Sequence, residues 1–159
     1  ILVGHSMGGV LATIMSLEYK AYIDRLILVN PALEYLRMQN GKLKIILSLR
    51  QGLKILSDKE NKEHSSKIRR CSISSIREFC SLVKEHRGDI EKVNCPILIL
   101  HGKKDYVVPI EQIENIYKTI ENKNKQFIVI ENGSHWILAR PLDSDVVKKI
   151  EKFLLITNK

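Results

Sequence analysis

A glycine-flanked serine near the start of the chain constrains the fold more than any other feature of this sequence. The pentapeptide Gly4-His5-Ser6-Met7-Gly8 stands between the apolar triplet 1–3 and the helix-forming run 10–15. A strand that turns sharply into a helix strains the residue at the turn, and glycines on both sides relieve the crowding while the serine hydroxyl is exposed. The segment therefore predicts a strand, a tight turn and a helix, with Ser6 as a nucleophile and with Gly4 and Gly8 both needed. Chance alone would supply such a pentapeptide in about one chain in twenty of this size, so its partners decide the interpretation.

Two polar side chains that could act with Ser6 follow predicted strands farther along the chain. Asp105 comes after residues 96–100, whose continuous apolar run is typical of a strand buried on both faces. His135 comes after a second apolar run at residues 126–130. Catalytic groups of open α/β sheets collect at the carboxyl ends of parallel strands. We therefore expect Ser6, Asp105 and His135 to meet at one edge of a sheet.

The three motifs make the chain resemble the α/β-hydrolase superfamily, and more narrowly its small bacterial carboxylesterases and monoacylglycerol lipases. The resemblance covers nearly the whole chain and rests on residues 4–9, 100–109 and 133–135, in the serine, acid, histidine order of that fold. It implies that Ser6 is the nucleophile, that His135 is the general base and then acid, and that Asp105 orients the imidazole. The backbone N–H of Met7 would be one oxyanion donor. The loop that supplies the second donor in this family is absent from the sequence.

The activity that this resemblance implies is cleavage of carboxylic esters through an acyl-enzyme. The substrates would be small molecules, namely short- to medium-chain acyl esters or monoacylglycerols, and no metal or organic cofactor is needed. An acyltransferase, a thioesterase or a perhydrolase could use the same three residues, and so remains an alternative. A non-catalytic ligand-binding protein of the same fold is a further alternative.

The chain begins only three residues before the pentapeptide at 4–8, which we call the nucleophile elbow, and it lacks an initiator Met. The resemblance implies about four further strands before Ile1, in a domain that commonly exceeds 200 residues. An apolar strand at Ile1 would then have an unpaired edge, and such edges favour aggregation. We therefore expect a C-terminal part of an esterase that is poorly soluble and nearly inactive when expressed alone.

Strand and helix alternate along most of the chain, as a parallel sheet requires. Besides the runs above, the pattern predicts a strand at 25–30 and helices at 110–120 and 143–155. In the last helix, apolar residues recur at helical spacing opposite a lysine face, namely Val146, Val147, Ile150, Phe153 and Leu154 against Lys148, Lys149 and Lys152. The predicted fold class is therefore α/β, the C-terminal part of a mostly parallel sheet flanked by helices. Its core would comprise residues 1–31 and 95–159.

Residues 32–94 lack the alternation of strand and helix and look helical throughout, which predicts a helical cap inserted over the site. Five apolar residues fall near one helical face, namely Leu43, Ile46, Leu47, Leu53 and Leu56. A polar linker at 57–66 and a second helix at 72–86 follow. Such a cap could line an acyl pocket or only pack on the sheet, and the pattern leaves both open.

The net charge of +8 is concentrated in the same segment. Residues 32–94 hold 14 Lys and Arg against 8 Asp and Glu, which accounts for +6 of the total. A basic cap with apolar faces suits transient contact with an anionic lipid surface, although a solvated face is the commoner case. Nucleic-acid binding is disfavoured, because there is no recognisable binding motif and no interleaving of aromatic residues among the basic ones. The sequence carries no signal for an oligomeric state.

The three cysteines, Cys71, Cys80 and Cys95, are widely spaced and form no metal-ligand pattern. Reduced thiols in a cytoplasmic protein fit this pattern best, although a signal peptide is not excluded by a chain that lacks its initiator. No apolar run reaches 18 residues, so the sequence contains no candidate membrane span.

The remaining histidines fit the catalytic roles less well than His135. His5 occupies the variable position of the elbow, where a packing role is expected, and His101 is expected to support the acid loop by a hydrogen bond. His64 and His86 fall in the cap or its linker, where solvated roles are expected.

Two other positions compete with Asp105 and Ser6. Some hydrolases of this fold carry the acid after the preceding strand, but this chain has Asn30 there. Ser134 is expected to be a hydrogen-bonding residue of its loop rather than a second nucleophile.

Overall fold

Four parallel strands form the main sheet of the protein. The computed structural model describes residues 1–34, 38–39, 42–43, 73–139 and 144–155. The strand order is β1 (Leu2–His5), β2 (Leu26–Val29), β5 (Ile97–Gly102) and β6 (Lys125–Ile130). All neighbouring pairs are parallel, and the register aligns the carboxyl ends of the strands at one edge. The predicted α/β class and all four predicted strands are confirmed.

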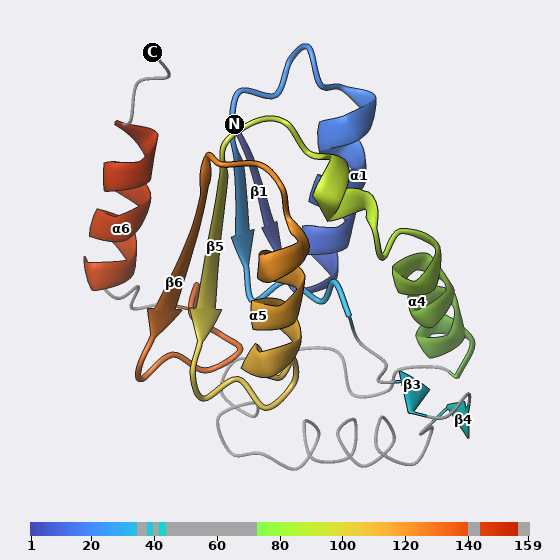
Figure 1. Cartoon of the computed structure of the whole chain (residues 1–159). Helices are drawn as coiled ribbons and strands as arrows, with labels where there is room; N and C mark the ends of the chain where they lie inside the picture. The colour runs from blue at the N-terminus through green and yellow to red at the C-terminus, as the bar shows by residue number, and fades with distance from the viewer. Residues whose placement is uncertain (35–37, 40–41, 44–72, 140–143, 156–159) are drawn as a thin grey trace.

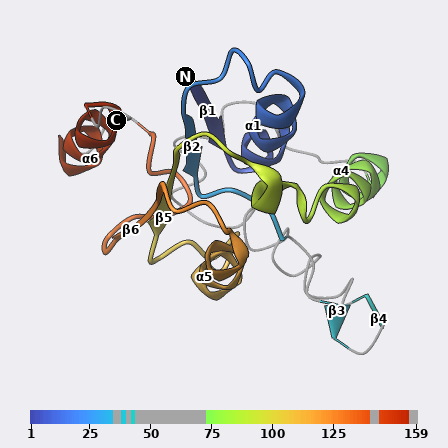
Figure 2. The same ribbon diagram turned by 45° about the horizontal axis from the view of Figure 1, so that its top comes forward.

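Helices cover both faces of this sheet (Figures 1 and 2). On one face lie α1 (Met7–Glu18), the short 3₁₀ helix η1 (Asp89–Lys92) and α5 (Ile110–Thr119). On the other face lies α6 (Ser144–Leu154). The predicted helices at 110–120 and 143–155 therefore exist, with ends within one residue of the predicted ones; Asp143 is outside the described residues.

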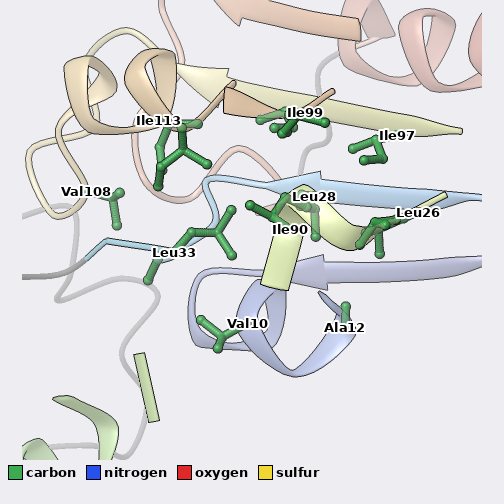
Figure 3. Packing of buried hydrophobic residues seen from close by; sticks show 14 of the residues in the cluster. Val10, Ala12, Leu26, Leu28, Leu33, Ile90, Ile97, Ile99, Val108 and Ile113 are labelled. Atoms are coloured by element: carbon green, nitrogen blue, oxygen red, sulfur yellow. The ribbon is translucent and has the colours of Figure 1, made fainter. Parts of the chain in front are cut away.

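The two central strands are buried on both faces, which explains their unbroken apolar sequences. Successive side chains of a strand point to opposite faces. One set, with Leu26, Leu28, Ile97 and Ile99, shares a cluster with residues of the helices on that face, among them Ile90 of η1 and Ile113 of α5 (Figure 3). The alternate set, with Ile27, Val29, Leu98 and Leu100, packs with Val146 and Phe153 of α6. The apolar stripe predicted for the last helix thus faces the core through Val146 and Phe153.

The segment 32–94 departs from the prediction of helix throughout. Met38–Gln39 (β3) pairs with Lys42–Leu43 (β4) in an antiparallel hairpin, so Leu43 lies in a strand rather than on a helical face. The sequence between the two strands is Asn40-Gly41, the dipeptide most favoured in two-residue hairpin loops. The apolar residues around this dipeptide also fit a helical spacing, and this is why the sequence pattern predicts a helix here.

A second part of the same segment agrees with the prediction. The helix expected at 72–86 is α4 (Ile73–Glu85), whose Val83 is buried in the core, with Phe79 and Leu82 packed against it. The linker at 57–66 and the apolar residues from Ile46 to Leu56 lie outside the described residues. The division into a core and a cap therefore stays a prediction.

Strand β1 lies at one edge of the sheet, and its outer surroundings are apolar. Ile1 and Val3 are 63% and 54% exposed, and Leu11 and Met15 on α1 and Tyr19 at its C-terminal end are also exposed. Among the helices of the described residues, none is both long and apolar enough to cross a membrane.

Candidate active site

Ser6 occupies a strained turn between β1 and α1. Its backbone has φ 54° and ψ −121°, a conformation that side-chain-bearing residues rarely adopt. Hydrogen bonds hold this peptide on both sides: Ser6 N donates to Val29 O at 3.1 Å, and Ser6 O accepts from Gly9 N at 2.9 Å and from Ala32 N at 3.0 Å. The strain is therefore supported by the end of β2 as well as by the helix that follows.

The two glycines of the pentapeptide contribute differently to this turn. A Cβ on Gly4 would lie 2.4 Å from Gly8 O and 2.7 Å from the Cβ of Ala12, so β1 and α1 approach too closely for a side chain there. A Cβ on Gly8 would meet nothing within 4 Å. The expectation that both glycines relieve crowding is right for Gly4 and wrong for Gly8, because the helix crosses the strand at Gly4.

His135 lies in the loop after β6 and connects the other two residues. Its Nδ1 is 2.8 Å from Asp105 Oδ2, and its Nε2 is 3.0 Å from Ser6 Oγ. A neutral ring with the proton on Nδ1 satisfies both contacts, since it donates to the carboxylate and accepts from the hydroxyl. His135 is 4% exposed and Asp105 is 6% exposed. Water therefore has little access to the hydrogen bond between these two residues, whereas the contact with Ser6 is only partly buried.

The carboxylate of Asp105 is fixed by its own loop after β5. Its Oδ1 accepts from Val107 N at 2.8 Å and from Val108 N at 2.9 Å, which leaves Oδ2 for the imidazole. His101, which is fully buried, hydrogen bonds through Nε2 to Val108 O at 3.0 Å. Burial lowers the pKa of His101 from its ordinary value, so a neutral ring supports the acid loop.

The loop after β5 that carries Asp105 (the acid loop) and the loop after β6 that carries His135 (the histidine loop) touch each other through glycines. A Cβ on Gly102 would lie 2.4 Å from Gly133 O, and one on Gly133 would lie 3.0 Å from Gly102 Cα. Lys104 N donates to Gly133 O at 2.9 Å and joins the two loops directly. Both glycines belong to the motifs that carry the family resemblance, but the sequence alone did not show that they face each other.

Two other polar residues lie beside His135. His5 Nε2 lies 2.8 Å from His135 O, and its ring centroid is 5.0 Å from that of His135. Burial lowers the pKa of His5, so its ring is neutral near pH 7. Asn30 also hydrogen bonds to the histidine loop. In the sequence, Asn30 is notable only because it stands where some hydrolases of this fold carry the catalytic acid.

The remaining candidates lie apart from this arrangement. His86 Nδ1 hydrogen bonds to Asp89 Oδ2 at 2.7 Å in the α4–η1 region, and Ser134 Oγ accepts from Trp136 N at 3.2 Å within its own loop. His64 is outside the described residues. Within the described part of the chain, no group of three or more His, Cys, Asp or Glu side chains could hold a metal ion.

Met7 contributes a backbone donor and the wall of a groove. As the first residue of α1, it has an N–H without an intrahelical acceptor, next to the Ser6 hydroxyl. Its side chain is half exposed and borders an open groove of about 570 Å³. The opposite wall is α4, with the apolar Phe79 and Leu82 and the acidic Glu78 and Glu85. The groove therefore borders the residue that follows Ser6 in the chain.

A family model described as serine aminopeptidase, S33, matches residues 1–141. A protein of Acanthamoeba polyphaga mimivirus, named as a candidate α/β hydrolase, is 32% identical over 65 residues. That match covers 41% of this chain and 23% of the viral protein.

Solved structures of the same fold include a monoacylglycerol lipase from Paleococcus ferrophilus, with a TM-score of 0.71 and 17% identity over 96% of this chain. Alpha/beta hydrolase domain-containing protein 10 from mouse gives 0.65 and 23% over 96%, and a lipase-esterase related protein from Clostridium acetobutylicum gives 0.65 and 16% over 95%. At these identities the similarity establishes the fold alone. The chain covers 66%, 60% and 64% of these three structures, respectively.

Proposed function

This chain belongs to the serine aminopeptidase S33 family of α/β hydrolases, and on that premise we propose that it carries the nucleophile, base and acid of a serine hydrolase acting on carboxylic esters. One observation carries the proposal. Three side chains from separate strand ends form a continuous hydrogen-bonded line, with Ser6 Oγ 3.0 Å from His135 Nε2 and His135 Nδ1 2.8 Å from Asp105 Oδ2.

The proposed reaction follows from the assignment of the His135 proton to Nδ1, which leaves Nε2 free to accept the proton of the Ser6 hydroxyl. Ser6 Oγ attacks the carbonyl carbon of the ester while its proton passes to His135 Nε2, and Asp105 stabilises the resulting imidazolium. The carbonyl oxygen becomes an oxyanion beside the N–H of Met7. His135 then gives the proton to the leaving alcohol as the C–O bond breaks, and the acyl group stays on Ser6. A water molecule, deprotonated by the same imidazole, releases the acid and restores the serine.

A small acyl ester suits the surroundings of Ser6. The groove that borders Met7, the residue after Ser6, has apolar wall residues in Met7, Phe79 and Leu82, which match an acyl chain. The solved structures of similar fold include proteins named as a monoacylglycerol lipase and as a lipase-esterase related protein. Contact of a basic cap with a lipid surface, a cytoplasmic location and the absence of the second oxyanion donor from this chain stay predictions.

Fluorophosphonate labelling tests the nucleophile. We expect wild type to react and Ser6→Ala not to react. The matched control is Ser134→Ala, which removes the neighbouring serine hydroxyl and should leave labelling intact. Asp105→Asn should slow the reaction by about 10⁴-fold, because the imidazole loses the partner that fixes its tautomer. Labelling that persists in Ser6→Ala would refute the assignment.

The substrate class requires a second measurement, because the family is named for an aminopeptidase. Turnover of p-nitrophenyl esters of increasing acyl length should be compared with turnover of aminoacyl p-nitroanilides and monoacylglycerols. We expect the esters to be cleaved faster than the anilides, at the low rate that the sequence predicts for this chain on its own. A labelled enzyme that prefers the anilides would keep the nucleophile assignment and overturn the ester assignment.

A further inference from the structure

Asn30 is a buried polar residue at the site that the reaction itself does not use. It follows β2 directly, is fully buried and has φ 43°, a left-handed conformation that Asn tolerates better than most residues. Its backbone N donates to Leu100 O at 2.9 Å. Asn30 therefore stands at the same edge of the sheet as Ser6, Asp105 and His135.

The side-chain amide of Asn30 connects the end of β5 to the histidine loop. Its Oδ1 accepts from Gly102 N at 2.8 Å. Its Nδ2 donates to Ser134 O and to His135 O, both at 2.9 Å. The amide nitrogen has two hydrogens, which match these two carbonyl acceptors. More than 100 residues separate Asn30 from the loop that it holds.

The carbonyl of His135 has a second donor on its other side. His5 Nε2 is 2.8 Å from the same oxygen, and burial keeps this ring neutral by lowering its pKa, so that Nε2 donates as an N–H when it carries the proton. A carbonyl oxygen has two lone pairs, and here Asn30 and His5 supply one donor for each. The peptide of His135 is thus held between the ends of β1 and β2.

The orientation of this peptide determines the direction in which the imidazole points. The ring must stay within hydrogen-bond distance of Asp105 on one side and of Ser6 on the other, and both partners are fixed on separate strand ends. A rotation of the peptide would move the ring away from one of them. Misplacement of a reacting group by about 1 Å costs on the order of 10²-fold in rate.

We propose that Asn30 is a positioning residue that, with His5, holds the backbone carbonyl of His135 and thereby aims its imidazole between Asp105 and Ser6. The proposal rests on the proposed function of His135 as the general base. It assigns to Asn30 an amide role, donation of two hydrogen bonds, that a carboxylate at this position could not perform.

Two variants of Asn30 remove the donors while keeping the backbone conformation. Asn30→Asp preserves size, tolerance of positive φ and the acceptor for Gly102 N. Asn30→Gly removes the whole side chain without strain at φ 43°. The matched control is Asn132→Asp, the same chemical change in the exposed turn of the histidine loop, where Oδ1 accepts from Lys104 Nζ at 2.9 Å.

Two readouts report on the ring rather than on folding. The first is the rate of fluorophosphonate labelling of Ser6 in the full chain. The second is the downfield proton resonance of His135 Nδ1–H in the NMR spectrum, which depends on its charge-assisted hydrogen bond to Asp105 and requires no turnover. Circular dichroism and thermal melting confirm that each variant is folded.

We expect both Asn30 variants to lose or broaden this resonance and to label about 10- to 100-fold more slowly, whereas Asn132→Asp matches wild type. Folded Asn30 variants that keep the resonance and the wild-type labelling rate would overturn the proposal. If wild type has the resonance but is not labelled, the proposed function fails, and the resonance in the variants still decides the role of Asn30.

The His5 side of the carbonyl gives an independent test if the Asn30 variants do not fold. His5→Leu removes the donor, and His5→Gln keeps an N–H near the position of Nε2. We expect His5→Leu to weaken the resonance and to slow labelling by about ten-fold, and His5→Gln to restore both. Indistinguishable behaviour of the two variants would also overturn the proposal.

Discussion

The contact between Gly102 and Gly133 gives the sharpest test of how the site is assembled. In Gly102→Ala, the new Cβ would lie 2.4 Å from Gly133 O, 2.6 Å from Gly133 C and 2.7 Å from Ser134 O. All three are backbone atoms, so no side-chain rotation relieves the contact. The substitution must separate the acid loop from the histidine loop.

The size of this separation follows from the distance itself. Ordinary van der Waals contact begins at 3.4 Å, so the 2.4 Å approach requires a displacement of about 1 Å. Residue 135 follows immediately, and its Nε2 is only 3.0 Å from Ser6 Oγ. We expect a loss of about 1–3 kcal/mol in the free energy of unfolding from overpacking. Labelling of Ser6 should slow by about 10²-fold, because the base no longer reaches the hydroxyl.

The assay combines urea unfolding with the rate constant for fluorophosphonate labelling. The control is Gly88→Ala, since a Cβ there would meet nothing within 4 Å and its φ of −91° suits alanine. This control should leave the labelling rate constant unchanged and should not lower the free energy of unfolding, since alanine at a compatible φ reduces the entropy of the unfolded chain. A folded Gly102→Ala protein that labels at the wild-type rate would refute the view that this glycine contact places His135.

Three further predictions concern the elbow, the pH dependence and the edge of the sheet. Gly4→Ala should lower the free energy of unfolding by about 1–3 kcal/mol, because a Cβ there meets neighbouring atoms. Gly8→Ala should raise it by about 0.5–1 kcal/mol, because a Cβ there meets nothing within 4 Å. Urea unfolding of the two variants measures both changes, and destabilisation by Gly8→Ala would contradict the prediction. Burial lowers the folded-state pKa of His101 below the unfolded value of 6.5, so the unfolded chain binds more protons, and stability present above pH 6.5 is lost as the pH falls through the folded-state pKa. His101→Gln keeps a donor for Val108 O but does not titrate, so its melting temperature should depend less on pH below 6.5; an unchanged slope would contradict the prediction. Val3→Lys, at an exposed position of the edge strand, should reduce aggregation measured by light scattering without changing the unfolding midpoint, and unchanged scattering would argue against this edge as the site of association.

The positions of Ser6, Asp105 and His135 relative to strands could be predicted because each follows a local signal. An apolar run of strand length ends just before each of them, and parallel strands end at one edge. The hairpin at residues 38–43 could also have been found, since Asn40-Gly41 is a local signal. It was missed because the surrounding apolar residues also fit a helical spacing, and two-residue strands contribute little pattern of their own.

The role of Asn30 and the packing of Gly102 on Gly133 could not be predicted in the same way. Asn30 belongs to no periodic apolar pattern and to no known motif. Its hydrogen-bond partners, the carbonyls of Ser134 and His135, lie more than 100 residues away in the sequence. The glycine contact depends on how two loops from neighbouring strands fold toward each other. Both features are set by the tertiary structure, and single-sequence patterns report only local geometry and burial.

The proposed nucleophile and the proposed base are held in place by different means, and this difference has a kinetic consequence. Ser6 belongs to the continuous backbone of β1 and α1, and its peptide is hydrogen bonded to Val29 and Ala32 at the β2 end. His135 depends instead on donors and packing from other loops. Asn30→Gly and Gly102→Ala should therefore displace the base and leave the serine and the groove beside Met7 intact. Saturation kinetics of labelling should show a lower maximal rate constant with an unchanged half-saturation concentration of the reagent, because binding precedes the proton transfer that these variants impair.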